Sequence, residues 1–85
     1  MNSFIFTKFA QKKFLKLEKT TQERIRAKML ELKNHEHLAA DLKFLTHFTH
    51  ATHRLRVGAY RLILQRVTET DFLIIDVGHS SQIYK

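Results

Sequence analysis

Three arginines in the second half of the sequence, Arg54, Arg56 and Arg61, have the spacing needed to hold a phosphate group on a β-hairpin. Gly58 and Ala59 separate two strand-like segments, and glycine at the first central position suits a type II′ turn. That turn places Arg56 opposite Arg61, with Arg54 on the same face because alternate strand residues share a side. Like charges directly opposite destabilise a sheet by up to about 1 kcal/mol, whereas a phosphate between guanidinium groups accepts paired hydrogen bonds. The pattern predicts a polyanion site, and a solvated charged face is the alternative.

The overall charge favours the same class of partner. The chain of 85 residues has 15 Lys and Arg against 8 Asp and Glu, which gives a net charge of +7 and a pI of 10.1. The positive electrostatic potential of such a chain attracts nucleic acids, acidic proteins or membrane surfaces. The absence of cysteine excludes disulfides and thiolate metal sites. Because the densest apolar stretch, at 72–75, is far shorter than the ~20 residues that span a bilayer, we expect a cytoplasmic protein without a membrane partner.

The elements that must position the hairpin follow from the hydrophobic pattern. Residues 42–48 fit either a helix end or a short strand, and 68–71 form a polar turn. Thr20 and Glu23 have the spacing of a capping box at the start of the second helix. The apolar stripes of the two helices are Ala10, Phe14 and Leu17, then Ile25, Met29 and Leu32. The remaining predicted elements are a strand at 3–6, a helix from the N-cap Thr7 to about Leu17, a helix from after Thr20 to about His35, and strands at 53–57, 60–67 and 72–77.

Together these elements predict an α+β domain over residues 1–85. Two N-terminal helices are expected to pack on one face of a twisted, mainly antiparallel sheet of four or five strands. The predicted hairpin register pairs Val57 with Tyr60, Arg56 with Arg61, Leu55 with Leu62 and Arg54 with Ile63.

Residues 53–62, His-Arg-Leu-Arg-Val-Gly-Ala-Tyr-Arg-Leu, closely resemble the R-L-R-V-G-x-Y-R-L segment of RelE-type toxins, in the RelE/ParE superfamily of toxin–antitoxin systems. Residues 41–45 are similar to the D-x-K-x-L step that precedes this segment in the family. Residues 76–84 are similar to the closing D-V-G-H-R-x-x-V-Y element. The helical first half also fits, so the resemblance covers nearly the whole chain.

The resemblance implies a microbial RNase-like fold that cuts messenger RNA in the ribosomal A site. It implies cleavage without a metal or small-molecule cofactor, and inhibition by a cognate antitoxin protein. By position, Arg54, Arg56 and Arg61 match the basic substrate-binding residues of the family. Tyr84 matches a C-terminal tyrosine implicated in cleavage, and Lys43 matches the lysine of the D-x-K-x-L step.

Two positions depart from the family pattern. His53 stands where an aromatic residue often opens the R-L-R segment, and Ser80 stands where an arginine usually follows Gly-His. The second change removes a cation from the vicinity of the scissile phosphate. We therefore expect weaker cleavage than in a relative that has the arginine.

Metal-independent cleavage of RNA uses the 2′-OH as the nucleophile, so the protein must orient it, neutralise the growing charge and transfer protons. Arginine neutralises charge but does not act as a proton shuttle. The candidates for proton transfer are His79, His53 and Tyr84, and His79 is preferred because histidine titrates nearest neutral pH. A hydrogen-bonding role at a strand end is the alternative for His79. The expected catalytic residues are Arg61, His79 and Tyr84, and the expected RNA-binding residues are Arg54, Arg56, Lys43, His53 and Ser80.

Six histidines raise the question of a metal site. His47, His50 and His53 lie three residues apart, and His35 and His37 lie two apart. No cysteine or tight acidic cluster completes either group, so no metal site is predicted.

Three functions remain open at the level of sequence. The first is a ribosome-dependent endoribonuclease toxin, whose partners are messenger RNA on the ribosome and an antitoxin. The second is a non-enzymatic inhibitor of DNA gyrase, as in ParE-like members of the superfamily. The third is a decayed toxin that keeps only antitoxin binding.

Overall fold

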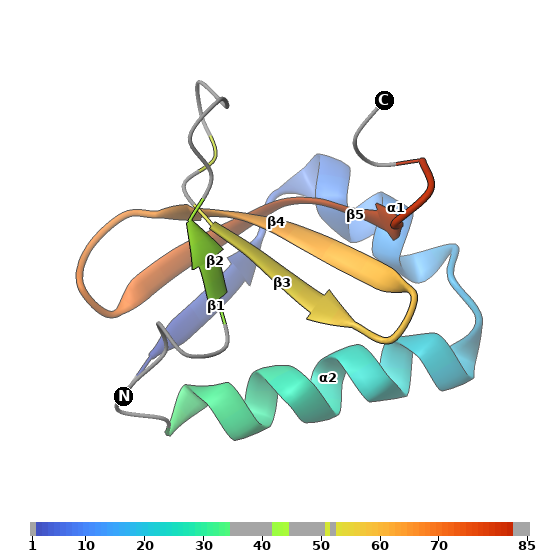
Figure 1. Ribbon diagram of the computed structural model, residues 1–85, viewed down its shortest axis with the longest axis horizontal. Coiled ribbons are helices and arrows are strands. Elements are labelled where there is room, and N and C mark those ends of the chain that lie inside the picture. Colours follow the sequence, from blue (N-terminus) through green and yellow to red (C-terminus); the bar gives the residue numbers. More distant parts are fainter. Residues whose placement is uncertain (1, 35–41, 45–50, 52, 83–85) are drawn as a thin grey trace.

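The computed structural model describes residues 2–34, 42–44, 51 and 53–82. The described residues form two helices and one five-stranded sheet (Figure 1). The α+β class and the predicted order of elements are confirmed. The helices are α1 (Lys8–Leu15) and α2 (Lys19–Lys33), and the strands are β1 (Ser3–Phe6), β2 (Leu42–Phe44), β3 (His53–Val57), β4 (Tyr60–Arg66) and β5 (Asp71–His79).

The sheet has the strand order β1-β5-β4-β3-β2. All neighbouring strands are antiparallel except β1 and β5, which are parallel, with Ser3 paired to Asp71. The sheet is therefore mixed but mainly antiparallel, as predicted. The ambiguous segment at 42–48 contributes the short strand β2, which pairs with β3 at one edge.

Helix α1 begins where its sequence predicts. The side chain of Thr7 accepts a hydrogen bond from the backbone N–H of Ala10 at 3.2 Å, so the predicted N-cap is confirmed. Ala10 and Phe14 are the buried residues of α1, in agreement with the predicted apolar stripe. The helix ends at Leu15, two residues before the predicted end.

Helix α2 begins earlier than predicted, at Lys19, and the proposed capping box is wrong. Glu18 occupies the N-cap position without a capping hydrogen bond from its side chain, and Thr20 lies inside the first turn. The connection to α1 is held instead by Gln22, a buried polar residue. Its amide Nε2 donates to the carbonyl oxygens of Leu15 and Leu17 at 3.3 and 2.9 Å. No helix in the described part of the chain is both long and apolar enough to cross a membrane.

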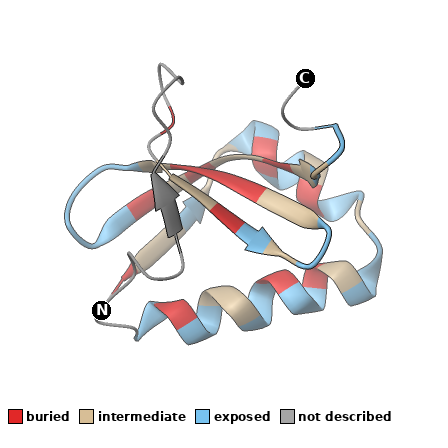
Figure 2. Cartoon of the chain, viewed as in Figure 1, coloured by how far each residue is buried: buried red, intermediate tan, exposed pale blue. Residues whose placement is uncertain are grey.

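Both helices contribute to one core on a single face of the sheet. Figure 2 shows buried segments along α1, α2 and the central strands. The core consists of Ala10 and Phe14 of α1, Ile25 and Leu32 of α2, and Leu55, Leu62, Leu64, Phe72, Ile74 and Val77 of the sheet. Phe4 and Phe6 of β1 and Met29 of α2 pack against its margin. We call this side of the sheet the helix face.

A β-bulge in β5 changes which residues point to the helix face. Ile63 of β4 pairs with Asp76, but the next residue, Leu64, pairs with Ile74, so Ile75 is the extra residue. Phe72 and Ile74 face the core before the bulge, and Val77 faces it afterwards. Without the bulge, strict alternation would have placed Asp76 in the core instead.

Candidate functional site

The β3–β4 hairpin has the predicted register at all four positions. Arg56 pairs with Arg61 and Arg54 with Ile63, while Leu55 pairs with Leu62 and Val57 with Tyr60. Gly58 has φ = +60°, and Ala59 does not have a positive φ, which matches a type II′ turn and not type I′. Apart from Gly58 itself and its two chain neighbours, no residue has an atom within 4 Å of the position that a Cβ of Gly58 would occupy. The glycine is thus required by the backbone conformation and not by crowding.

Arg54, Arg56 and Arg61 lie on the face of the hairpin opposite the core. Their sequence neighbours Leu55 and Leu62, which point to the other side of the strands, are 1% and 0% exposed and belong to the core cluster. Arg56 is exposed, and its Nε donates to the carbonyl oxygen of Gly58 at 3.1 Å. Arg54 and Arg61 are partly buried. We call this side of the sheet the arginine face.

The end of β5 brings Ser80 next to the hairpin. Gly78 pairs with Arg61, and the backbone N–H of Ser80 donates to the carbonyl oxygen of Ala59 in the hairpin turn at 2.8 Å. The structure therefore brings Ser80 to the same end of the sheet as Arg56 and Arg61. Lys43 of β2 is the Cα partner of Arg54, so its backbone also borders the hairpin.

His79 lies on the helix face and not on the arginine face. It pairs with Tyr60, and the two rings meet edge to face with centroids 5.5 Å apart. Its Nδ1 accepts a hydrogen bond from the backbone N–H of Ser81 at 3.2 Å and lies 2.8 Å from the Ser81 hydroxyl oxygen. A neutral ring that accepts at Nδ1 carries its proton on Nε2. The structure does not bring His79 together with the arginines.

His53 is also on the helix face. It pairs with the fully buried Leu64, and its ring meets the edge of Phe72 at 6.0 Å. Burial lowers the pKa of His53 below its ordinary value, and the positive charge of Arg66 lowers this pKa further. Both effects favour the neutral form of the ring, and the structure separates it from Arg54 and Arg56.

Other sequence predictions fall outside the described residues. Tyr84 is one of them, as are His35, His37, His47 and His50 of the histidine groups. Among the residues that the structure does describe, no group of three or more His, Cys, Asp or Glu is placed to hold a metal ion.

An ion pair between Lys13 and Asp76 was not predicted. The Nζ of Lys13 donates to the Oδ1 of Asp76 at 2.6 Å, and the backbone N–H of Val77 donates to the same oxygen at 2.8 Å. By backbone pairing, Asp76 shares a side of the sheet with Ile63 and Arg54, while its carboxylate is bound by a lysine of α1. The lysine compensates the negative charge of Asp76, which would otherwise oppose an anion bound near Arg54.

Comparisons with known proteins agree with this fold. The model of the family described as the ParE toxin of type II toxin–antitoxin systems, parDE, matches residues 4–84. No curated protein matches the chain.

Solved structures give a consistent result. A chain of the intact E. coli RelBE toxin–antitoxin complex is 25% identical over 94% of this chain and 98% of its own length, with a TM-score of 0.70. The isolated E. coli RelE toxin is 26% identical over 93% of this chain and 84% of its own, with a TM-score of 0.69. A chain of the RelB–RelE complex from Methanococcus jannaschii, at 24% identity over 94% of each chain and a TM-score of 0.71, has the same fold. The chain therefore belongs to the RelE/ParE family of toxins of type II toxin–antitoxin systems.

Proposed function

We propose that this toxin is a ribosome-dependent endoribonuclease that binds messenger RNA on its arginine face and cleaves it in the A site. The observation that carries the proposal is the pairing of Arg56 with Arg61 across the hairpin, with Arg54 on the same face. Such clustering of like charge opposes folding unless an anion joins it. A phosphate group between these guanidinium groups would accept paired, charge-assisted hydrogen bonds. The ribosome would place the toxin in the cytoplasm.

The chemistry assigns different tasks to the residues around this face. The 2′-OH loses its proton and attacks the neighbouring phosphorus, and the P–O5′ bond breaks to give a 2′,3′-cyclic phosphate and a 5′-oxygen that takes up a proton. Arg61 and Arg56 neutralise the charge that develops on the phosphorane. Lys43 and Ser80, whose backbones border the hairpin, are proposed to contact the RNA. Proton transfer requires a group on the same side as the phosphate. Because His79 and His53 lie on the helix face, Tyr84 is the remaining candidate for this task.

Primer extension on ribosomes programmed with a defined messenger tests this proposal. Wild-type toxin should cut in the A site, and Arg61→Ala and Tyr84→Phe should each reduce the rate at least about tenfold. Arg24→Ala, which removes the same charge from an exposed position of α2, is the matched control and should cut like the wild type. Cleavage that survives both Arg61→Ala and Tyr84→Phe would show that the chemistry lies elsewhere.

We further propose that a cognate antitoxin, encoded by a neighbouring reading frame, binds this chain. The supporting finding is that similar solved structures include complexes of RelE toxins with RelB antitoxins. With a net charge of +7, the chain is suited to an acidic partner segment that becomes ordered on binding. Co-expression of the two reading frames should give one complex in size-exclusion chromatography. Separate elution of the two proteins would contradict the proposal.

Inhibition of DNA gyrase is the second candidate. It is favoured by the match to the ParE family model and by Ser80, which replaces an arginine near the proposed cleavage site. Induced expression separates the two candidates. An endoribonuclease would stop protein synthesis first, whereas a gyrase inhibitor would first change the supercoiling of plasmid DNA. Growth without either effect would indicate a chain that retains only antitoxin binding.

A further inference from the structure

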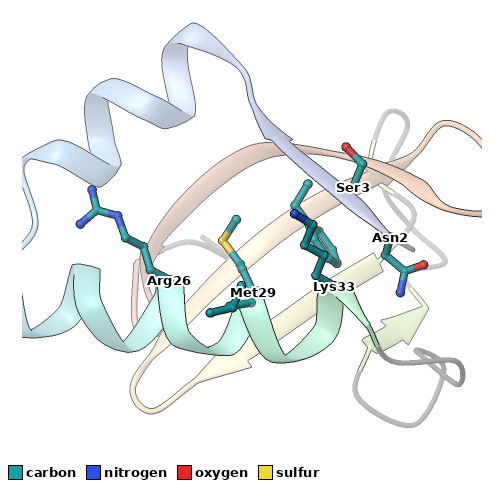
Figure 3. Close-up of a pocket in the computed structure, with 7 residues that line it drawn as sticks. Asn2, Ser3, Arg26, Met29 and Lys33 are labelled. Atoms are coloured by element: carbon teal, nitrogen blue, oxygen red, sulfur yellow. The ribbon is translucent and has the colours of Figure 1, made fainter.

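A groove on the helix face, between α2 and β1, is not used by the proposed cleavage site. It has a volume of about 300 Å³ and is lined by Asn2, Ser3, Phe4, Arg26, Met29, Leu30 and Lys33. Figure 3 shows Met29 between Arg26 at one end of the groove and Lys33 at the other. We call it the α2–β1 groove.

The apolar part of the groove is formed by Phe4, Met29 and Leu30. Phe4 is held in place by stacking on Phe72, with ring centroids 5.4 Å apart. Met29 is partly buried, and its flexible thioether side chain adapts to different neighbours. The side chain of Leu30 is 66% exposed, more than any other large hydrophobic residue in the described part of the chain. A leucine at the edge of an apolar groove loses unfavourable contact with water when a partner covers it.

The two ends of the groove are positively charged. Arg26 and Lys33 are seven residues apart on α2, which is two helical turns or about 10 Å along the axis. The guanidinium group of Arg26 lies over the ring of Phe14 at 5.1 Å, which holds it near the groove. Among the described residues, no carboxylate forms an ion pair with Arg26 or Lys33.

The walls of the groove are fixed relative to one another. The backbone N–H of Asn2 donates to the carbonyl oxygen of Lys33 at 2.7 Å. The side-chain Nδ2 of Asn2 donates to the carbonyl oxygen of Leu32 at 2.9 Å. These bonds join the start of β1 to the last turn of α2 and satisfy carbonyl groups at the helix end. The groove is therefore preformed, and binding there requires little reorganisation of the toxin.

From these features we propose that the α2–β1 groove binds a segment of the antitoxin in which large apolar side chains are flanked by carboxylates. The apolar side chains would cover Phe4, Met29 and Leu30, and the carboxylates would pair with Arg26 and Lys33. This inference rests on the proposed antitoxin partner. It adds that the antitoxin is anchored on the helix face, separately from whatever segment covers the arginines on the opposite face.

If a second segment of the antitoxin covers the arginine face, the two contacts strengthen each other. Once one segment is bound, a second segment joined to it by a short linker is present at an effective concentration in the millimolar range. Loss of the groove contact should therefore weaken the whole complex while leaving the arginine face intact. Cleavage of RNA by the free toxin should not change.

The test measures the affinity of the toxin for the purified product of the neighbouring reading frame, by fluorescence anisotropy. Leu30→Asp should weaken binding at least about tenfold, because it removes a covered leucine and places a negative charge against the carboxylates. Leu15→Asp is the matched control, since Leu15 is similarly exposed, at 58%, but lies outside the groove. It should change the affinity less than about twofold.

Charge reversal provides a second matched pair. Arg26 lines the groove, so Arg26→Glu reverses a charge there. Arg24→Glu reverses the same charge two residues away, at an exposed position of α2 outside the groove. Arg26→Glu should weaken antitoxin binding at least several-fold more than Arg24→Glu. All four variants should melt within a few degrees of the wild type and should retain wild-type cleavage of ribosome-bound messenger.

The outcomes distinguish failure of the antitoxin assignment from failure of the groove assignment. If wild-type toxin does not bind the neighbouring product at all, the antitoxin assignment fails and this inference fails with it. If the complex forms and Leu30→Asp and Arg26→Glu bind as tightly as their controls, the groove is not an antitoxin site. Self-association of wild-type toxin that Leu30→Asp abolishes would assign the groove to a second copy of this chain and would also overturn the proposal.

Discussion

Replacement of Arg56 by alanine tests whether this arginine binds RNA or stabilises the fold. Arg56 is exposed, directly opposes Arg61 and donates one hydrogen bond from Nε to the carbonyl oxygen of Gly58. Loss of an opposed like charge should stabilise the hairpin by a few tenths to about 1 kcal/mol. Loss of the exposed hydrogen bond should destabilise it by about 0.5 kcal/mol, the low end for such a bond. The two effects nearly cancel, so the melting temperature should shift by less than about 4 °C.

The effect of Arg56→Ala on RNA binding should be much larger. Hydrogen bonds to a charged group contribute about 1.5–3 kcal/mol, which corresponds to a loss of roughly ten- to a hundredfold in affinity. Loss of one phosphate contact on single-stranded RNA should also reduce the slope of log K against log salt by about 0.7. Both quantities can be measured by fluorescence anisotropy with a short single-stranded RNA at several salt concentrations.

Arg24→Ala is the control for this experiment because it removes the same charge from an exposed position on α2. It should leave the salt slope close to that of the wild type. A variant Arg56→Ala that melts ten or more degrees lower and keeps the wild-type salt slope would show that Arg56 is structural. The assignment of the arginine face to RNA would then be wrong.

Three further predictions follow from single positions. Ser80→Arg should raise the rate of messenger cleavage, by up to ~10²–10³-fold if the new guanidinium group reaches the phosphate, as measured by primer extension; an unchanged rate would show that position 80 does not face the reacting group. Because the pKa of His53 is lowered in the folded state, the unfolded state binds more protons in acid, so stability should fall as the pH drops below the ordinary value of 6.5. Melting temperatures between pH 7.5 and pH 5 should show this fall for the wild type, and His53→Gln should have a flatter profile. Gly58→Ala should destabilise the fold by about 1–2 kcal/mol through its positive φ alone, since no atom crowds the position, and a melting temperature equal to that of the wild type would contradict this.

The hairpin was predictable in detail because its information is local. Gly58 determines the turn type, and the turn type determines which residues face each other. The buried faces of the helices were predictable for a similar reason, since Phe14 and Ile25 follow the helical period. The parallel pairing of β1 with β5 has no such local signal, because it joins segments at opposite ends of the sequence.

The position of His79 could not be predicted from the alternation of residues along β5, because the β-bulge interrupts this alternation. If β5 alternated without interruption from Phe72, His79 would point to the arginine face. The extra residue Ile75 reverses the alternation, which moves His79 to the helix face and Asp76 to the arginine face. Asp76 also forms an ion pair with Lys13, a residue with which it shares no sequence motif, so no local pattern predicts this contact. The start of α2 was mispredicted because Gln22, and not Thr20, fixes the connection to α1.

The strand order also governs when the protein can first become active during its own synthesis. β5 lies between β1 and β4, yet it is translated after both of them. A nascent chain that has only reached Arg66 already contains the arginine hairpin but lacks Phe72, Ile74 and Val77 of the core. Without these residues β1 has no neighbouring strand and the helices have no complete surface to pack on. Incomplete chains from interrupted translation should therefore remain unfolded and be degraded by proteases. The ribosome that makes the toxin should thus not meet a partly folded toxin that already has the arginine hairpin.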